Sequence, residues 1–262
     1  MARKAGREHE FESYFSAIYL ERWPALRAAL LLDNPKTVLN NPFGHGLSDY
    51  SLDRASVFPV RFLDLQEDQI MADFCASPGG KSLASVFGLR GRAHWFCNDL
   101  SASRMSRLKS VFHDSLPPEI LANRVHFSVS DASRWGLKRQ EHFDRVLVDA
   151  PCSGERHLLH STSELKRWSL KGAKRLVIRQ HALLCSALDC TKPGGRVVYS
   201  TCSINPLEND GVIQRLNRNR EGKFRVLAAE GVELGEATEH GRILLPDRDQ
   251  CGPIYFSILL KV

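Results

Sequence analysis

Residues 145–153 read RVLVDAPCS, and residues 196–203 read RVVYSTCS. In each stretch, an apolar run typical of a buried strand is followed at once by polar residues and a cysteine. The carboxyl ends of neighbouring strands in an open α/β sheet lie at one edge, and ligands bind there. We therefore expect Asp149, Cys152 and Cys202 to meet at one edge of a sheet.

Strand and helix patterns alternate on both sides of these stretches, from residue 69 onward. The predicted parallel strands are 70–75, 93–97, 124–129, 143–148 and a fifth that follows Gly195. The predicted helices end at Phe87 or span 101–113, 172–191 and 206–220. Three further strands are predicted at 224–228, 242–245 and 254–262. This order predicts an α/β fold, a doubly wound sheet with an antiparallel tail.

The chain before this alternation has a different pattern. Apolar residues recur at helical spacing over 8–33, and Pro24 is expected to kink or split that helix. Two domains are therefore predicted: an N-terminal helical extension over 1–66, a candidate RNA contact, and a catalytic domain over 67–262.

The composition is that of a soluble globular protein, with 43% hydrophobic and 25% charged residues. The net charge of +6 fits an anionic partner such as nucleic acid. Seven cysteines without zinc-site spacing predict no metal, and a reducing compartment. We expect that compartment to be the cytoplasm, or the mitochondrial matrix if the chain is a mature organellar form. No apolar run approaches the roughly 20 residues that cross a bilayer, so no membrane association is expected.

A glycine-rich turn, Pro78-Gly79-Gly80-Lys81, follows the first predicted strand and opens a helix. Glycines let the backbone approach a ligand, and a helix N-terminus favours an anion. Neither the phosphate-binding loop pattern nor the dinucleotide pattern of glycines is present. Asp99 and Asp131 follow the next two strands, where an acid commonly binds ribose. Together these features favour a nucleoside site, although each residue alone also fits an ordinary turn or cap.

Three motifs resemble signatures of the Nop/Sun family of RNA cytosine-5 methyltransferases. They are DFCASPGGK at 73–81, DAPCS at 149–153 and STCS at 200–203. Residues 98–101, 156–157 and 252–256 are most similar to the mitochondrial small-subunit-rRNA branch of that family. The resemblance implies a Rossmann-like, seven-stranded sheet of the S-adenosylmethionine-dependent methyltransferase type. It also implies S-adenosylmethionine as cofactor and RNA as substrate, with rRNA first and tRNA as the alternative.

The resemblance implies four catalytic residues. Cys202 would be the nucleophile that adds to C6 of cytosine, which makes C5 reactive toward a sulfonium methyl. Asp149 would hydrogen-bond the N3/N4 edge, and Cys152 would assist loss of the C5 proton. Lys81 would orient Asp149 or the base.

The resemblance also implies the cofactor contacts. Asp99 would bind the ribose, Asp131 the adenine, and the backbone of Ala76 and Gly79 the methionine part. The full implied set is Cys75, Ala76, Ser77, Pro78, Gly79, Gly80, Lys81, Asp99, Arg104, Asp131, Asp149 and Pro151.

Alternative roles remain open for the cysteines. DNA cytosine methyltransferases use a Pro-Cys at the first of these strand ends, which would make Cys152 the nucleophile. The second thiol, at Cys202, favours the RNA-type assignment. As catalytic candidates, Cys75, Cys97 and Cys251 are set aside as structural, apolar cysteines.

The chain departs from the family directly after Cys152. Members often have Gly-Thr-Gly there, whereas this chain has Gly154-Glu155-Arg156-His157. We expect this loop to approach RNA, so the departure bears on substrate identity. With only about 65 residues before the core, we also expect a protein partner or substrate structure to help bind the RNA.

A basic run follows the first cysteine and is expected to track RNA phosphates. Its members are Arg156, Lys166, Arg167, Lys171, Lys174, Arg175 and Arg179. Trp168 or His157 could stack on a base, although for Trp168 a place in the core is the favoured interpretation. The target base must be single-stranded or flipped out, because C6 is unreachable inside a duplex.

Three hypotheses of function follow. The first is methyl transfer to C5 of a cytosine in structured RNA. The second is a catalytically idle RNA-binding ribosome-assembly factor with the same fold, against which the intact Asp149, Cys152 and Cys202 argue. The third is a small-molecule methyltransferase, which the paired thiols and the basic run disfavour.

Overall fold

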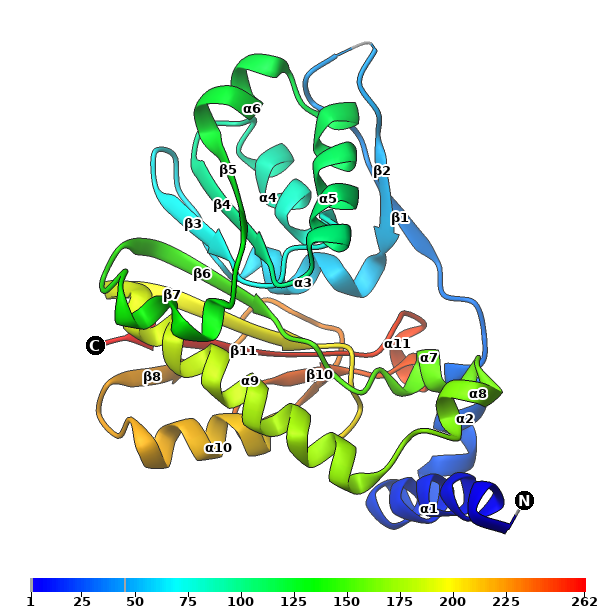
Figure 1. Ribbon diagram of the computed structural model, residues 1–262. Coiled ribbons are helices and arrows are strands. Elements are labelled where there is room, and N and C mark those ends of the chain that lie inside the picture. The colour runs from blue at the N-terminus through cyan, green and yellow to red at the C-terminus, as the bar shows by residue number, and fades with distance from the viewer. Residues whose placement is uncertain (1, 45) are drawn as a thin grey trace.

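A central, mostly parallel sheet organises the molecule (Figure 1). The structure is a computed structural model that describes residues 2–44 and 46–262. The parallel strands lie in the order β5 (Val125–Val129), β4 (His94–Asp99), β3 (Ile70–Asp73), β6 (Phe143–Asp149) and β7 (Thr191–Thr201). The antiparallel part continues with β11 (Ile254–Lys261), β10 (Arg242–Leu244) and β9 (Glu236–Ala237), and β8 (Phe224–Leu227) also pairs with β11. The doubly wound fold class is therefore confirmed. The sheet has nine strands in place of the seven that the resemblance implied, and β9 is the one that the sequence pattern did not predict.

Helices cover both faces of the sheet (Figure 1). One face carries α4 (Gly80–Gly88) and α5 (Ala102–Ser115), and the other carries α9 (Leu170–Cys190) and α10 (Asp210–Asn219). The short helices between strands are α6 (Pro118–Arg124), η3 (Ala132–Leu137), α7 (Glu155–Leu159), α8 (Thr162–Leu165) and α11 (Pro246–Asp249). Because β6 lies in the middle of the sheet, Val146, Leu147 and Val148 are fully buried. Burial on both faces explains why this strand is a continuous apolar run rather than an alternating one.

The N-terminal extension is split as predicted near Pro24. It consists of α1 (Ala2–Tyr19), a 3-10 turn η1 (Leu20–Arg22), α2 (Trp23–Leu30), the antiparallel pair β1 (Lys36–Leu39) and β2 (Tyr50–Asp53), η2 (Arg54–Ser56) and α3 (Val57–Arg61). Pro24 lies in the first turn of α2, where its missing N–H costs nothing. The strand pair β1–β2 was not predicted, so the extension is not purely helical.

An aromatic cluster joins this extension to the main domain. The ring centroids of Phe11 and Trp168 lie 5.2 Å apart, and those of Phe15 and Trp23 lie 5.3 Å apart. Trp168 is only 5% exposed, which confirms the favoured interpretation that it is a core residue. Aromatic contacts of this kind add to the hydrophobic stabilisation from buried area.

The helix predicted from Pro206 begins later, at Asp210. Side-chain bonds hold the preceding residues as a loop: Thr201 Oγ1 donates to Asn209 Oδ1 at 2.6 Å, and Asn209 Nδ2 donates to Ser203 O at 3.0 Å. Such local bonds compete with helix formation. Across the described ranges, the helices are too short or too polar to cross a bilayer.

Candidate active site

The two cysteines predicted to meet lie in contact. β6 and β7 are parallel neighbours with Asp149 beside Ser200, so the segments after both strands leave the same edge. Ala150 N donates to Ser200 O at 2.8 Å and holds the two segments together. The sulfur atoms of Cys152 and Cys202 are 3.2 Å apart. Cys202 is exposed, whereas Cys152 is half-buried.

The two thiols have opposite pKa shifts. The hydrogen bond from Cys152 lowers the pKa of Cys202, and the positive charge of Lys81 acts in the same direction. The same hydrogen bond, together with burial, raises the pKa of Cys152. The favoured arrangement is therefore a Cys202 thiolate that accepts a hydrogen bond from the Cys152 thiol. Since the thiolate is the reactive form, this asymmetry favours Cys202 as the nucleophile.

A lysine and a carboxylate lie beside the sulfurs. Lys81 Nζ is 2.8 Å from Asp149 Oδ2, and Ser200 Oγ donates to Asp149 Oδ1 at 2.8 Å. The negative charge of Asp149 raises the pKa of Lys81 against the effect of burial, so the lysine is charged. The contact with Asp149 is the one expected if Lys81 orients that carboxylate, the first of the two predicted alternatives, and the role itself stays a prediction.

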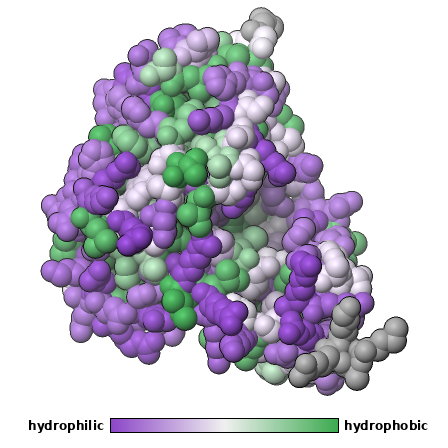
Figure 2. Space-filling view, in the orientation of Figure 1, coloured by the Kyte–Doolittle hydropathy of each residue, from purple (hydrophilic) through white to green (hydrophobic). Residues whose placement is uncertain are grey.

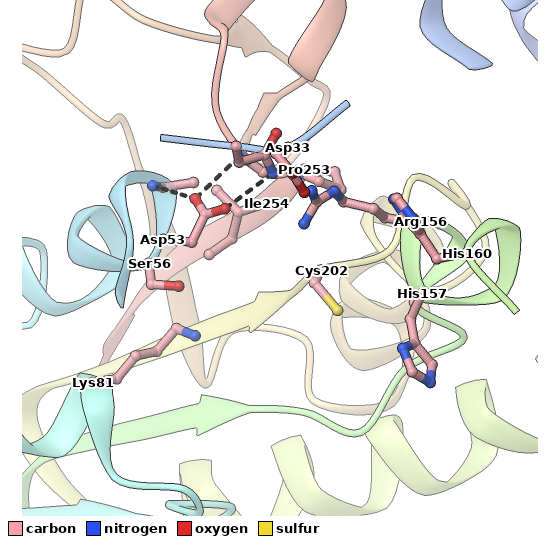
Figure 3. A pocket seen from close by; sticks show the side chains of 14 residues that line it. Asp33, Asp53, Ser56, Lys81, Arg156, His157, His160, Cys202, Pro253 and Ile254 are labelled. Carbon is pink, nitrogen blue, oxygen red and sulfur yellow. Dashed lines mark hydrogen bonds between the residues drawn. The ribbon is translucent and has the colours of Figure 1, made fainter. Parts of the chain in front are cut away.

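A cavity of about 420 Å³ opens at Cys202. Figure 3 shows Cys202 between Lys81 on one side and His157 on the other. Asp53 on the cavity wall accepts hydrogen bonds from Asn34 Nδ2 and Gly252 N, each at 3.1 Å. The remaining lining comes mainly from the N-terminal extension, α7 and the segment before β11: Asp33, Ala55, Ser56, Gly154, Arg156, His160, Pro253 and Ile254. A concave site with a few convergent polar groups is suited to a small planar group such as a base.

The side chains of the segment after Cys152 differ in direction, some toward the protein interior and others toward the surface. Gly154 has φ +63°, and a Cβ there would lie 3.7 Å from the Cys202 sulfur, so a glycine suits this turn. Glu155 is fully buried, which corrects the expectation that the whole loop approaches RNA. Arg156 Nη2 donates to Leu32 O at 2.7 Å, whereas His157 is exposed. Only the outer part of this loop is therefore available to a substrate.

Hydrogen bonds to Asp73 hold the glycine-rich turn after β3 in place. This buried carboxyl accepts a hydrogen bond from Ser82 Oγ at 2.6 Å and one from Cys75 N at 3.3 Å. Burial raises the pKa of Asp73 to about 7. Gly79 has φ +119°, and a Cβ on Gly80 would lie 2.8 Å from the ring of Tyr50. Both glycines are therefore required by the backbone and its neighbours.

Two polar atoms near this turn are buried without a hydrogen-bond partner, Asp99 Oδ2 and Ser77 Oγ. Asp99 Oδ1 accepts from Ser101 N at 2.9 Å, and Arg104 Nη1 lies 3.5 Å from Oδ2. Buried polar atoms without a partner are costly, so at a strand end such atoms suit a ligand that would pair with them. An acceptor after the second parallel strand fits a ribose hydroxyl, and the residues present therefore fit an adenosyl cofactor.

The other predicted cofactor residues differ in how they are engaged. Arg104 Nη2 donates to Ser77 O at 2.7 Å and braces the turn. Asp131 is exposed and accepts from Ser133 N and Oγ, so part of its carboxylate already caps η3. Ala76 N donates to Asn98 O at 2.8 Å, which commits that N–H to the protein. Pro151 O accepts from Gln180 Nε2 at 2.9 Å.

The basic run lies mostly at the surface. On the face drawn in Figure 2, hydrophobic residues are scattered in small groups among hydrophilic ones. The exposed members of the run are Arg167, Lys171, Lys174, Arg175 and Arg179. An exposed set of cations close to α7 suits phosphate binding.

Several residues at the site were not predicted. Asp53, Ser56 and His160 line the cavity, and no motif singled them out because they lie at the end of β2, in η2 and just after α7. Glu208 is fully buried behind the cysteines, although a glutamate at the start of a predicted helix carries no sequence signal of burial. For Glu155, the sequence signal that could have pointed to a special role was the departure from the Gly-Thr-Gly found in many family members.

Comparison with known proteins places this geometry in context. The family described as 16S rRNA methyltransferase RsmB/F matches residues 60–260. The 5-cytosine rRNA methyltransferase NSUN4 of Mus musculus is 43% identical over 234 residues, covering 83% of this chain and 61% of that protein. The mitochondrial tRNA (cytosine(34)-C(5))-methyltransferase of Danio rerio is 34% identical over 227 residues, covering 81% and 60%. The chain spans about three-fifths of the length of these curated relatives.

Solved structures share the fold. The crystal structure of PH0851 matches with a TM-score of 0.80 at 21% identity, covering 96% of this chain and 65% of that one. The structure of NSun6 from Pyrococcus horikoshii with SFG matches with a TM-score of 0.70 at 22% identity, covering 82% and 53%. At these identities the likeness extends to the arrangement of the sheet and its helices.

Proposed function

The chain belongs to the 16S rRNA methyltransferase RsmB/F family, and from this premise we propose that it methylates C5 of a cytosine in ribosomal RNA. The cofactor would be S-adenosylmethionine. One observation carries the proposal: the Cys152 and Cys202 sulfurs lie 3.2 Å apart at the strand ends that also hold the Lys81–Asp149 pair. A structural pair of buried cysteines would not need a charged lysine and an open cavity beside it.

The cofactor would lie along the glycine turn after β3. Asp99 Oδ2, which accepts no hydrogen bond within the described residues, would accept one from a ribose hydroxyl, and Asp131 would contact the adenine. Gly79 and Gly80 let the ligand approach the backbone. When bound, the cofactor supplies an electrophilic methyl group on its sulfonium.

The protein side of the reaction uses the thiol asymmetry. The Cys202 thiolate adds to C6 of the cytosine, which forms a C–S bond and turns C5 into an enamine-like nucleophile. Asp149, oriented by Lys81 and Ser200, would hydrogen-bond the N3/N4 edge as charge builds there. After methylation, loss of the C5 proton, assisted by Cys152, re-forms the C5–C6 double bond and breaks the C–S bond to release Cys202.

The choice of RNA follows from the relatives and the charge. Several relatives are described as 5-cytosine rRNA methyltransferases, and others as mitochondrial tRNA (cytosine(34)-C(5))-methyltransferases. We therefore place rRNA first, tRNA second, and the mitochondrion ahead of the cytoplasm. The N-terminal extension contributes Asp33, Asn34 and Asp53 to the cavity wall, which makes it part of the proposed RNA contact. A protein partner that helps to bind the RNA remains a prediction.

The assignment of the nucleophile can be tested with RNA that contains 5-fluorocytosine. This base blocks loss of the C5 substituent, so the covalent adduct accumulates and is seen as a slow-migrating band on a denaturing gel. Cys152→Ala should still trap the RNA, and Cys202→Ala should not. Trapping by Cys202→Ala but not by Cys152→Ala would reverse the two roles.

The activity itself is tested by methyl transfer from tritium-labelled cofactor to rRNA and tRNA pools, with bisulfite sequencing to locate the base. Label in a single rRNA cytosine is expected. No transfer to either pool would favour the RNA-binding assembly factor instead.

A further inference from the structure

Two fully buried glutamates lie behind the cysteines, and the proposed reaction does not use either of them. Glu155 is three residues after Cys152, and Glu208 is six residues after Cys202. Both side chains are 0% exposed. Among residues 2–44 and 46–262, neither carboxyl forms a salt bridge. Buried carboxyls without a cation require another form of compensation.

The two carboxyls form hydrogen bonds between the segment of Cys152 and the segment of Cys202. Glu155, on the segment of Cys152, accepts a hydrogen bond from Ile204 N at 2.9 Å, just after Cys202. Glu208, on the segment of Cys202, accepts one from Ser153 N at 2.9 Å, just after Cys152, and a second from Ser153 Oγ. Each carboxyl therefore binds the segment that carries the other cysteine, and separation of the two sulfurs would break bonds to both.

The hydrogen-bond geometry around Ser203 points to a proton held by the pair. Ser203 Oγ lies 3.1 Å from Glu155 Oε1 and 3.3 Å from Glu208 Oε1, and it accepts a hydrogen bond from Asn205 N. A hydroxyl has one hydrogen and donates it to one acceptor. The second carboxyl contact is satisfied only if that carboxyl is protonated and donates to Ser203.

The hydrogen-bond donors decide which glutamate carries the proton. Glu208 accepts from Ser153 N, Ser153 Oγ and Gln180 Nε2, the last at 2.8 Å. Burial raises the pKa of Glu208 as well, but its several donors lower it and stabilise the carboxylate, so Glu208 is the better placed of the two to be the anion. Burial, with the charge of Glu208 beside it, raises the pKa of Glu155 to about 8. The chain of donation therefore runs from Glu155 through Ser203 to Glu208.

We propose that Glu155 and Glu208 are positioning residues that share one proton through Ser203 and keep the Cys152 and Cys202 sulfurs in contact. This inference rests on the proposed function for its catalytic consequence, because sulfur contact is what favours the Cys202 thiolate. The site therefore needs Glu155 as a hydrogen-bond donor and Glu208 as an acceptor. A second negative charge in this buried place would push the two segments apart.

Among the described residues, the titratable groups that interact with the pair carry no positive charge. They are the phenols of Tyr14 and Tyr19 from α1, the phenol of Tyr199 from β7, and the two thiols. Burial raises the pKa of Tyr14, Tyr19 and Tyr199, so these phenols stay neutral near pH 8. Apart from the two thiols, the group in this set that loses a proton in this pH range is therefore Glu155.

The test compares three variants of the full chain: Glu155→Ala, Glu155→Gln and Glu208→Gln. A glutamine at 155 still accepts from Ile204 N and donates to Ser203, as the protonated glutamate does. A glutamine at 208 replaces one carboxylate oxygen with an NH₂ group. That group cannot accept the hydrogen bond that the oxygen accepted. We expect Glu208→Gln and Glu155→Ala to lower kcat at least about 30-fold, and Glu155→Gln to restore it to within about threefold of the unsubstituted protein.

Two readouts separate positioning from folding. The rate of Cys202 alkylation by iodoacetamide, followed by peptide mass spectrometry, reports the thiolate without any RNA. It should fall several-fold at pH 7 in Glu208→Gln and Glu155→Ala, but not in Glu155→Gln. The kcat of the unsubstituted protein should also decline as pH rises through about 8, and Glu155→Gln should remove that decline. Circular dichroism checks that each variant folds.

The outcomes are distinct. Folded Glu208→Gln with unchanged alkylation and unchanged kcat would overturn the proposal, and so would Glu155→Gln that behaves like Glu155→Ala. If the unsubstituted protein methylated no RNA, the proposed function would fail, while the alkylation rates would still decide whether the glutamates position the sulfurs.

Discussion

Two parts of the strand-end edge differ in how completely their polar groups are paired. At the ends of β6 and β7, which we call the cysteine edge, Asp149 has partners on both oxygens and the two sulfurs contact each other. At the ends of β3 and β4, the cofactor edge, Asp99 Oδ2 and Ser77 Oγ are buried without a hydrogen-bond partner. The proposed reactive groups are thus organised by contacts within the protein, whereas the proposed cofactor edge has polar atoms that accept no hydrogen bond from the described residues.

This difference has a physical reason. Catalytic groups gain most when they are held in the geometry of the transition state in advance, because they then need no reorganisation during the reaction. A binding group gains affinity when its polar atoms exchange water for a ligand, so full pairing within the protein would be a disadvantage. Substitutions at the cysteine edge should therefore affect turnover, and those at the cofactor edge should affect cofactor affinity.

The largest effect is expected from Lys81→Met at the cysteine edge. Asp149 loses the cation that orients it, and the pKa of Cys202 rises because a nearby positive charge is gone. We expect kcat for methyl transfer to fall about 100- to 1,000-fold. Lys223→Met, an exposed lysine just before β8 and outside the basic run, is the control. A loss of less than about fivefold would show that the cysteine edge does not depend on this ion pair.

A smaller effect of another kind is expected from Asp99→Ala at the cofactor edge. Loss of a charged acceptor for a ribose hydroxyl should raise the KM for S-adenosylmethionine about 10- to 100-fold. The kcat at saturating cofactor should change little. Asp131→Ala is the matched comparison, and its effect on KM should be smaller because that carboxylate also caps η3. Calorimetric titration measures both affinities. A fall in kcat with unchanged KM would remove the distinction between the two edges.

Outside both edges, the basic run should contribute to RNA affinity without changing chemistry. For Lys174→Ala combined with Arg175→Ala, both exposed on α9, we expect the RNA Kd to rise several-fold at low salt. The slope of log Kd against log salt should fall by about 1.4, since each phosphate contact on a single strand contributes about 0.7. Arg218→Ala on α10 is the control. An unchanged slope would exclude these residues from the RNA path.

The smallest effect concerns stability at the cysteine edge. Between its ordinary value of 4.5 and about 8, Glu155 keeps a proton in the folded state that the unfolded chain has lost. The folded state then binds more protons, so the free energy of unfolding falls as pH rises through this window and levels off above it. Asp73 contributes in the same direction between 3.8 and about 7. Urea unfolding of Glu155→Gln should show a flatter pH dependence than the unsubstituted protein, and equal slopes would place the proton elsewhere.

Much of the fold followed from the sequence because its parallel strands are buried on both faces. Continuous apolar runs such as 145–148 are typical of such strands, and polar residues mark where they end. The proximity of Cys152 and Cys202 was predictable for the same reason, as parallel neighbours end at one edge. Their roles, and those of the cofactor residues, remain proposals that the geometry supports.

The features that were not predicted depend on contacts between distant residues. Glu155 is buried because Ile204 and Ser203 compensate its carboxyl, and neither is near it in sequence. The strand pair β1–β2 is short and half-exposed, so it lacks a hydrophobic pattern. Local propensity also fails at Pro206, where side-chain bonds to Thr201 and Ser203 hold a loop in place of a helical turn.

The aromatic cluster of α1, α2 and Trp168 bears on how the protein can be divided. The family match begins at residue 60, but Phe11, Phe15 and Leu26 are fully buried in the same hydrophobic cluster as the helices behind β6 and β7. A chain shortened to the matched range would leave Trp168 and its neighbours in water. Such a fragment should self-associate and precipitate, so the unit suited to expression and crystallisation includes both N-terminal helices.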